Sequence, residues 1–198
     1  IERLLEDPQV TAERERVTRA AKTTQPANDN DGSLPPFSNM TMVDFTRADH
    51  RNAFPKTIAE VRTKLGKIYP LYINGKELVT SDTIPTVNPA QPSEVLGRIC
   101  MAGTAEVDQA IAAAKAAFPA WRDTAPEVRA GYLLKAAGIA RRRIFELSAW
   151  QVLEVGKQFD QAYADVAEAI DFLEYYAREM IRLGVPQRVG HAPGELNH

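Results

Sequence analysis

In the second half of the chain, apolar residues recur at steps of three and four, and this spacing limits the fold more than any other feature. Such a period predicts amphipathic α-helices with one apolar face each. We expect three helices. The first is alanine-rich and runs from its N-cap Thr104 to about Phe118. The second opens with a capping box of Thr124 and Glu127, and the third runs from about Asp160 to Leu183. The apolar stripe of the second helix comprises Leu133, Ala137, Ala140, Ile144 and Leu147. The inward residues of the third are Val166, Ile170, Leu173, Ala177 and Met180.

The first half of the chain favours shorter elements. One helix is predicted from Asn52 to Gly66. The Asn74-Gly75 pair separates two short runs and predicts a β-hairpin over Leu71 to Leu78, with a type I′ turn in which both turn residues have positive φ. Two more extended segments follow, Ile84 to Asn88 and Val95 to Met101. The chain is therefore assigned to the α/β class, with mostly helices, a small hairpin and short strands.

Four stretches of different composition suggest how the chain is organised. Residues 1–22 are highly charged and fit a helical segment that trails an upstream domain. Residues 23–48 are rich in Asn, Asp, Ser, Gly and Pro, which is typical of a linker. Residues 49–185 carry the folded elements, and residues 186–198 contain one more expected strand with no partner after it. Since the first residue is isoleucine and no signal peptide is recognisable, we expect the sequence to be a piece of a longer chain.

The composition argues against several classes of function. The 198 residues carry a formal net charge of -2, whereas nucleic-acid-binding proteins usually have a clearly basic surface. The longest stretch without a charged residue, Gly32 to Val43, is polar and much shorter than the roughly 20 apolar residues of a transmembrane helix. A single cysteine excludes an internal disulfide and fits a cytoplasmic location. The three histidines are scattered and give no metal-ligand spacing.

Two conspicuous candidates for chemistry are rejected because of their surroundings. Cys100 lies in an apolar stretch that predicts a buried strand, so we interpret it as a core residue rather than a nucleophile. Arg141, Arg142 and Arg143 are consecutive on a helix, so their side chains diverge over about 200° and form a solvated face. The sequence has no glycine-rich phosphate loop and no serine–histidine–acid set. The residues by themselves therefore indicate a segment without catalytic groups.

The third predicted helix carries more informative candidates. Asp165, Glu168, Phe172 and Tyr175 form a second stripe, separate from the apolar face. We expect a carboxylate beside two aromatic rings to be partly desolvated, and such groups are often functional. The alternative is an ordinary solvent-facing surface on which Glu174 and Arg178 form an i,i+4 ion pair. The spacing leaves both interpretations open.

Several motifs resemble those of aldehyde dehydrogenases. They are Tyr69-Pro70-Leu71-Tyr72-Ile73-Asn74-Gly75-Lys76, Val87-Asn88-Pro89, Pro92-Ser93-Glu94-Val95-Leu96-Gly97, the alanine-rich stretch from Val107 to Trp121, and Glu154-Val155-Gly156-Lys157. The segment from Asp165 to Ala177 resembles the L-glutamate γ-semialdehyde (1-pyrroline-5-carboxylate) dehydrogenase branch in particular, and Pro193-Gly194-Glu195 agrees with it. The resemblance covers about Asp44 to His198 and implies the N-terminal portion of an aldehyde dehydrogenase fold.

This resemblance implies an enzyme that oxidises L-glutamate γ-semialdehyde to glutamate with NAD. The catalytic cysteine and the dinucleotide site of the family match no residue of this sequence. No catalytic, cofactor-binding or metal-binding residue is therefore assigned, and the 198 residues alone are expected to be inactive. Only Glu168 matches a position that the branch places near the aldehyde pocket, where its carboxylate would bind the substrate's α-amino group with Phe172 behind it.

The arm formed by residues 1–31 resembles the joint in bifunctional proline utilization A, where a proline dehydrogenase domain comes first. That domain would add FAD and would be compatible with peripheral membrane association of the cytoplasmic protein. The residues from Pro186 onward resemble the first strand of the hairpin through which family members form homo-oligomers. Two alternatives stay open: a non-catalytic assembly or partner-binding module of the same ancestry, and an aldehyde dehydrogenase of different substrate range.

Overall fold

The computed structural model describes residues 34–185 and Gly190. The chain divides into two units, residues 1–37 and residues 38–198, and all of the helices and strands described belong to the second unit. The predicted helical segment 1–22 lies outside the described residues, as does most of the predicted hairpin start at 186–198. No helix in the described part of the chain is both long enough and apolar enough to span a membrane.

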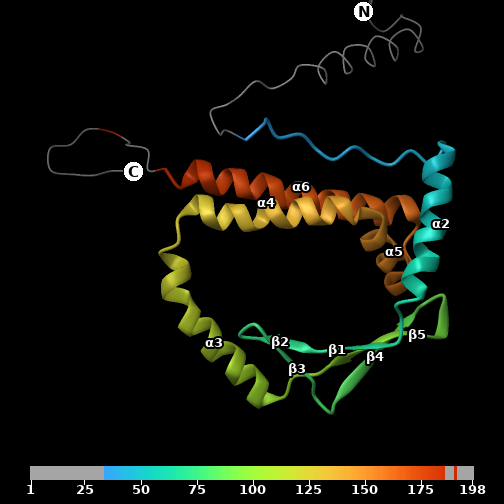
Figure 1. Ribbon diagram of the computed structural model, residues 1–198, viewed down its shortest axis with the longest axis horizontal. Coiled ribbons are helices and arrows are strands. Elements are labelled where there is room, and N and C mark those ends of the chain that lie inside the picture. Colours follow the sequence, from blue (N-terminus) through green and yellow to red (C-terminus); the bar gives the residue numbers. More distant parts are fainter. Residues whose placement is uncertain (1–33, 186–189, 191–198) are drawn as a thin grey trace, which may run out of the picture. The chain divides into compact units, whose positions relative to one another are not determined.

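Helix α2 (Ala48–Arg62) begins four residues before the predicted start and leads into the short strands (Figure 1). Strands β2 (Leu71–Ile73) and β3 (Lys76–Leu78) form the predicted hairpin, in which Ile73 pairs with Lys76. Between them Asn74 and Gly75 have φ angles of 52° and 72°. Both angles are positive, as the predicted type I′ turn requires.

A three-stranded sheet has β5 (Gln91–Cys100) at its centre, between β1 (Lys67–Tyr69) and β4 (Thr83–Asn88). Strand β1 runs parallel to β5 and β4 runs antiparallel to it. Glycine at position 97 allows the two strands and the Tyr69 ring to approach closely, since a Cβ atom there would lie 2.6 Å from Cε2 of Tyr69 and the ring would have to shift. The sequence did not predict β1, since three residues are too few to show a period.

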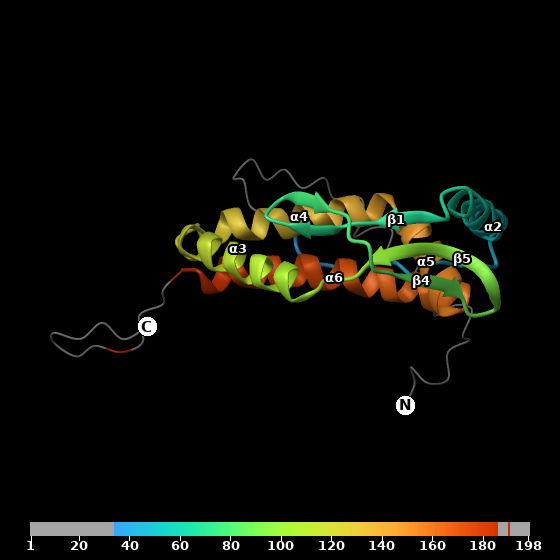
Figure 2. The same ribbon diagram turned by 90° about the horizontal axis from the view of Figure 1, so that it is seen from below.

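Four helices follow the sheet: α3 (Thr104–Arg122), α4 (Pro126–Arg142), α5 (Ile144–Val155) and α6 (Phe159–Leu183). Helix α6 confirms the prediction for the third helical segment. Helices α4 and α6 lie side by side along much of their length (Figures 1 and 2).

The predictions for the other two helical segments of the second half are wrong in several details. Thr104 is the first helical residue rather than the N-cap, which is Gly103, and α3 continues past Phe118. Thr124 does not cap the next helix, because its hydroxyl donates to the Ala120 carbonyl oxygen of the preceding one at 2.7 Å. The second predicted helix is two helices, since Arg143 has φ -109° and ψ 17° and breaks it between α4 and α5.

Two apolar clusters hold the second unit together, and α5 contributes to both. The first joins α4, α5 and α6 and comprises the buried residues Ala137, Ile144, Tyr163, Val166, Ala167 and Ile170. The second joins α2, β5 and α5 through Val61, Leu96, Ala149 and Leu153. Because α5 packs against the helices on one side and against the sheet on the other, it fixes α6 relative to β5.

Candidate functional site

Helix α6 presents the predicted site residues on the side away from its core face. Its buried residues, including Val166, Ala167 and Ile170, face α4 and α5. Glu168 lies between them in sequence but on the opposite side of the helix, because successive helical residues are about 100° apart. Its residue is exposed in the described part of the chain, so the predicted partial desolvation is wrong here: Phe172 and Tyr175 are themselves exposed and do not cover it.

Glu168 differs from the other acidic residues of α6 in having no partner. Asp165 pairs with Lys157, Glu174 pairs with Arg141 and Arg178, and Glu179 pairs with Arg182. The two remaining acidic groups, Asp160 and Asp171, accept hydrogen bonds from backbone or side-chain nitrogens. Among the residues that the structure describes, Glu168 is thus the one α6 carboxylate without an ion pair or a hydrogen bond.

Aromatic rings follow Glu168 along the same side of α6. Phe172, one turn further on, is 49% exposed and stacks on Tyr176 with ring centroids 5.7 Å apart. Tyr175 meets Tyr176 edge to face at 5.5 Å. A free carboxylate next to an accessible aromatic surface can bind an ammonium group through both charge and the face of a ring.

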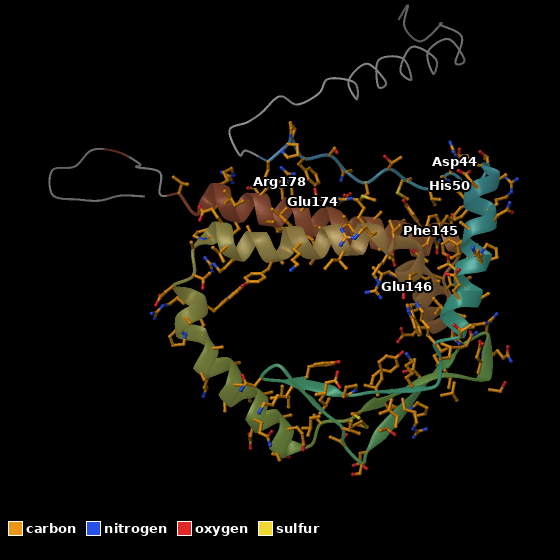
Figure 3. All side chains as sticks on the ribbon, in the orientation of Figure 1. Asp44, His50, Phe145, Glu146, Glu174 and Arg178 are labelled. Atoms are coloured by element: carbon orange, nitrogen blue, oxygen red, sulfur yellow. The ribbon has the colours of Figure 1, made fainter. Side chains whose placement is uncertain are left out.

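The ion pair proposed in the alternative interpretation also forms. Glu174 and Arg178 lie 3.8 Å apart on α6 (Figure 3). Both belong to a network with Arg141 of α4, so they join the two helices. This pairing uses Glu174 and leaves Glu168 free, so it does not decide the role of Glu168.

The rejected candidates have the surroundings that the sequence indicated. Cys100 is 2% exposed at the end of β5, and its Sγ accepts a hydrogen bond from the Thr80 backbone nitrogen at 3.4 Å. Arg141, Arg142 and Arg143 are exposed. Arg141 pairs with Glu174, whereas Arg143 pairs with Glu146 at 2.8 Å, so these side chains point to different acids.

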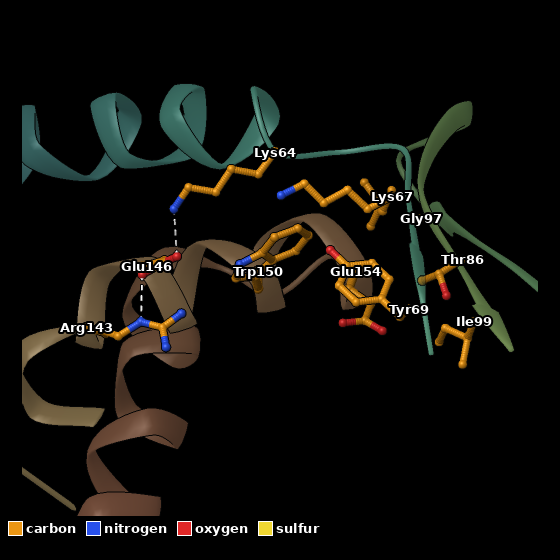
Figure 4. Close-up of a pocket in the computed structure, with 11 residues that line it drawn as sticks. Lys64, Lys67, Tyr69, Thr86, Gly97, Ile99, Arg143, Glu146, Trp150 and Glu154 are labelled. Carbon is orange, nitrogen blue, oxygen red and sulfur yellow. Dashed lines mark hydrogen bonds and ion pairs between the residues drawn. The ribbon is translucent and has the colours of Figure 1, made fainter. Parts of the chain in front are cut away.

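A pocket of about 550 Å³ lies between the end of α2, the sheet and α5 (Figure 4). Trp150, Tyr69 and Leu96 contribute apolar surface to it. Glu146 accepts hydrogen bonds from Arg143 and Lys64, both at 2.8 Å, and these lower the pKa of its carboxyl to about 2. No residue of α6 lines the pocket, so it is separate from Glu168 and Phe172.

Sequence reasoning missed this pocket and also missed Asp171 as a contact residue. Both depend on residues that are far apart in sequence, such as Lys64 with Glu146 and Asn39 with Asp171. No motif or period links such positions. Only the folded arrangement could have shown them.

The N-terminus of α3 is occupied by one of its own side chains. Helix α3 begins after Gly103, where a phosphate could accept hydrogen bonds from the first amides. The Glu106 carboxylate occupies this end, because its Oε2 accepts from the Gly103 nitrogen at 2.8 Å. The part of the chain described here also contains no group of three His, Cys, Asp or Glu side chains that could hold a metal ion.

Comparison with known proteins gives a consistent result. The sequence pattern of the aldehyde dehydrogenase family matches residues 78–197. The 1-pyrroline-5-carboxylate dehydrogenase of Bacillus pumilus is 44% identical over 162 residues, which are 82% of this chain and 32% of that protein. The 1-pyrroline-5-carboxylate dehydrogenase 2 of Halalkalibacterium halodurans is 46% identical over 164 residues, or 83% of this chain and 32% of that protein.

Solved structures agree with the sequence relatives. A Thermus 1-pyrroline-5-carboxylate dehydrogenase is 44% identical with a TM-score of 0.77, over 82% of this chain and 32% of that one. Proline utilization A from Bdellovibrio bacteriovorus is 40% identical with a TM-score of 0.78, over 89% of this chain and 18% of that one. The chain spans about a third of the length of the curated relatives it matches. Because the family pattern matches more than half of the residues, the chain belongs to the aldehyde dehydrogenase family.

Proposed function

We propose that the chain is the N-terminal part of an NAD-dependent dehydrogenase that oxidises L-glutamate γ-semialdehyde, the open-chain hydrated form of 1-pyrroline-5-carboxylate, to L-glutamate. The observation that carries the proposal is the unpaired Glu168 carboxylate one turn before the exposed ring of Phe172. Identities of 44% and 46% to 1-pyrroline-5-carboxylate dehydrogenases support the same substrate.

In this proposal Glu168 recognises the substrate and does not take part in bond making. The semialdehyde carries an α-ammonium group at the end opposite its aldehyde. A carboxylate without an internal partner can accept charge-assisted hydrogen bonds from that group, and the Phe172 ring can cover its carbon chain. Cys100 is buried in β5 and is not assigned as the nucleophile; in this proposal the groups that break the C–H bond belong to the rest of the enzyme.

The cofactor and the wider architecture are part of the same proposal. The related Thermus structure has bound NAD, which supports NAD as the oxidant here. The similarity to proline utilization A reaches over 89% of this chain, which supports a bifunctional protein with a proline dehydrogenase domain that uses FAD. We further propose a cytoplasmic homo-oligomer assembled through a hairpin that begins near Pro186.

Replacing Glu168 with glutamine in the full-length protein tests substrate recognition. We expect kcat/KM for L-glutamate γ-semialdehyde to fall roughly 10- to 100-fold, mainly through a higher KM, because glutamine keeps an acceptor oxygen but lacks the negative charge that strengthens its bond to the ammonium group. For 5-oxopentanoate, which is the same molecule without the amino group, kcat/KM should stay within about twofold of the wild-type value.

The matched control is Glu60→Gln on α2, another exposed glutamate whose side chain forms no ion pair among the described residues. It should leave both substrates unaffected. If Glu168→Gln changed the two substrates equally, Glu168 would have no role in amino-group recognition. An aldehyde dehydrogenase of different substrate range would then be favoured.

A further inference from the structure

The segment formed by residues 39–43, here called the strap, lies against α4 and α6, although the sequence indicated a linker there. Met40 and Val43 pack against the apolar cluster of α4, α5 and α6. The Tyr163 hydroxyl of α6 donates to the Thr41 carbonyl oxygen at 3.3 Å. The strap is thus bound to the helices by both apolar and polar contacts.

Asp171 is the main polar anchor of the strap. Its Oδ1 accepts a hydrogen bond from the Met40 backbone nitrogen at 2.8 Å, and its Oδ2 accepts one from the Asn39 side-chain nitrogen at 2.9 Å. Asn39 and Asp171 are 132 positions apart in sequence. A carboxylate that uses both oxygens on one segment holds that segment in a defined place and direction.

Asp171 lies three residues after Glu168, so the two carboxylates are neighbours on the surface of α6. The strap therefore contacts α6 next to the side that carries Glu168, while α4 and α5 hold the helix from its buried side. The contacts of the strap thus add to those of α4 and α5 in holding α6. A displacement of about 1 Å at a binding group can cost a large part of its effect.

The two donors of the strap also engage both carboxylate oxygens of Asp171. If its two donors were removed, a second free carboxylate would stand one turn from Glu168. The two like charges would repel each other, and Asp171 would compete for the same ammonium group. With the strap bound, Glu168 is left as the free carboxylate on this side of the described helix.

We propose that Asp171 is a positioning residue: by binding the strap through Asn39 and Met40, it fixes α6 and leaves Glu168 as the carboxylate that receives the substrate's amino group. This inference rests on the proposed function. It assigns to residues 39–43 a part in substrate recognition, although they do not touch the substrate.

The test compares Asp171→Ala, Asp171→Asn and Asn39→Ala in the full-length protein. For Asp171→Ala we expect KM for L-glutamate γ-semialdehyde to rise about 3- to 10-fold with little change in kcat, and kcat/KM for 5-oxopentanoate to stay within about twofold. Asp171→Asn keeps one oxygen that can accept from Met40, so it should recover part of the loss. Asn39→Ala removes one donor without altering α6 and should raise KM about 2- to 5-fold.

Hydrogen exchange at the Met40 amide shows whether the strap has been released, and it should be faster in Asp171→Ala. The control is Glu179→Ala on the same helix, which removes an acid paired with Arg182 and not with the strap. It should change neither KM nor Met40 exchange.

Equal losses with both substrates, or faster Met40 exchange with an unchanged KM, would overturn the inference. If Asp171→Ala does not fold, the Asn39→Ala result decides by the same criteria. The outcome separates the two proposals. If Glu168→Gln weakens turnover of L-glutamate γ-semialdehyde but not of 5-oxopentanoate, and the Asp171 and Asn39 variants do not, only the role of the strap is rejected. If Glu168→Gln itself shows no such difference between the substrates, the proposed function is rejected.

Discussion

At the scale of single residues, several acidic side chains in the described part of the second unit are held by close donors. Glu94 accepts hydrogen bonds from Asn88 and Arg62, which lower the pKa of its carboxyl. Glu146 is held by Arg143 and Lys64 in the same way. Among the acidic side chains described on α6, Glu168 is the one without such a donor. A carboxylate without an internal partner is available to a ligand.

The ion pairs of Glu146 predict a dependence of stability on pH. Its carboxyl pKa is lowered from 4.5 to about 2 in the folded chain. Its contribution to the free energy of unfolding is therefore full above pH 4.5 and is lost as the pH falls toward 2. Because the side chains of Lys64 and Arg143 are about half exposed, solvent screens the two ion pairs, and we expect them to add about 1 kcal/mol to the free energy of unfolding. Urea unfolding of Glu146→Gln should show this deficit at pH 6 and almost none at pH 2.5. A deficit that did not depend on pH would contradict the assignment.

At the scale of elements, α2 is attached to the rest of its unit by an aromatic cluster around Phe54. The Phe54 ring is fully buried and stacks on Phe159 of α6 with centroids 4.5 Å apart. Phe45 and Phe145 meet it edge to face at 5.9 Å and 5.7 Å. The cluster joins the first helix of the unit to the start of the helix that carries Glu168.

Phe54→Ala should therefore destabilise the protein by about 3 to 5 kcal/mol, because it leaves a cavity among closely packed rings. Phe172→Ala makes the same truncation on a half-exposed ring and should cost less than about 1.5 kcal/mol. Thermal or urea unfolding of the two variants measures the difference. Similar losses for both would show that Phe54 does not hold α2 in the way described.

The sequence predicted elements with a local signal and missed those set by distant contacts. The hairpin at Asn74 and Gly75 could be predicted because a type I′ turn has a specific residue pair. The break at Arg143 could not, since the apolar stripe continues across it without glycine or proline. The composition of residues 23–48 as a whole predicts a linker, whereas residues 39–43 within it are placed by distant contacts with Asp171 and the apolar cluster. Glu168 was found through resemblance and spacing, whereas its lack of a partner became visible only in the structure.

At the scale of the whole molecule, α3 shows how this chain relates to its longer relatives. None of the residues of α3 is buried in the described part of the chain. Its apolar side chains Val107, Ile111, Phe118 and Trp121 are between 47% and 58% exposed. The relatives are about two and a half times as long. A surface of this kind is suited to packing against further protein, which agrees with a role as one part of a larger enzyme.

The most direct test of the central claim is the substrate preference of the full-length protein. NADH formation should be measured with L-glutamate γ-semialdehyde and with 5-oxopentanoate under the same conditions. We predict that kcat/KM for the amino-bearing substrate is at least about 10-fold higher, because the Glu168 carboxylate binds only that substrate's ammonium group. Equal values for the two substrates, or no NADH formation with either, would contradict the account.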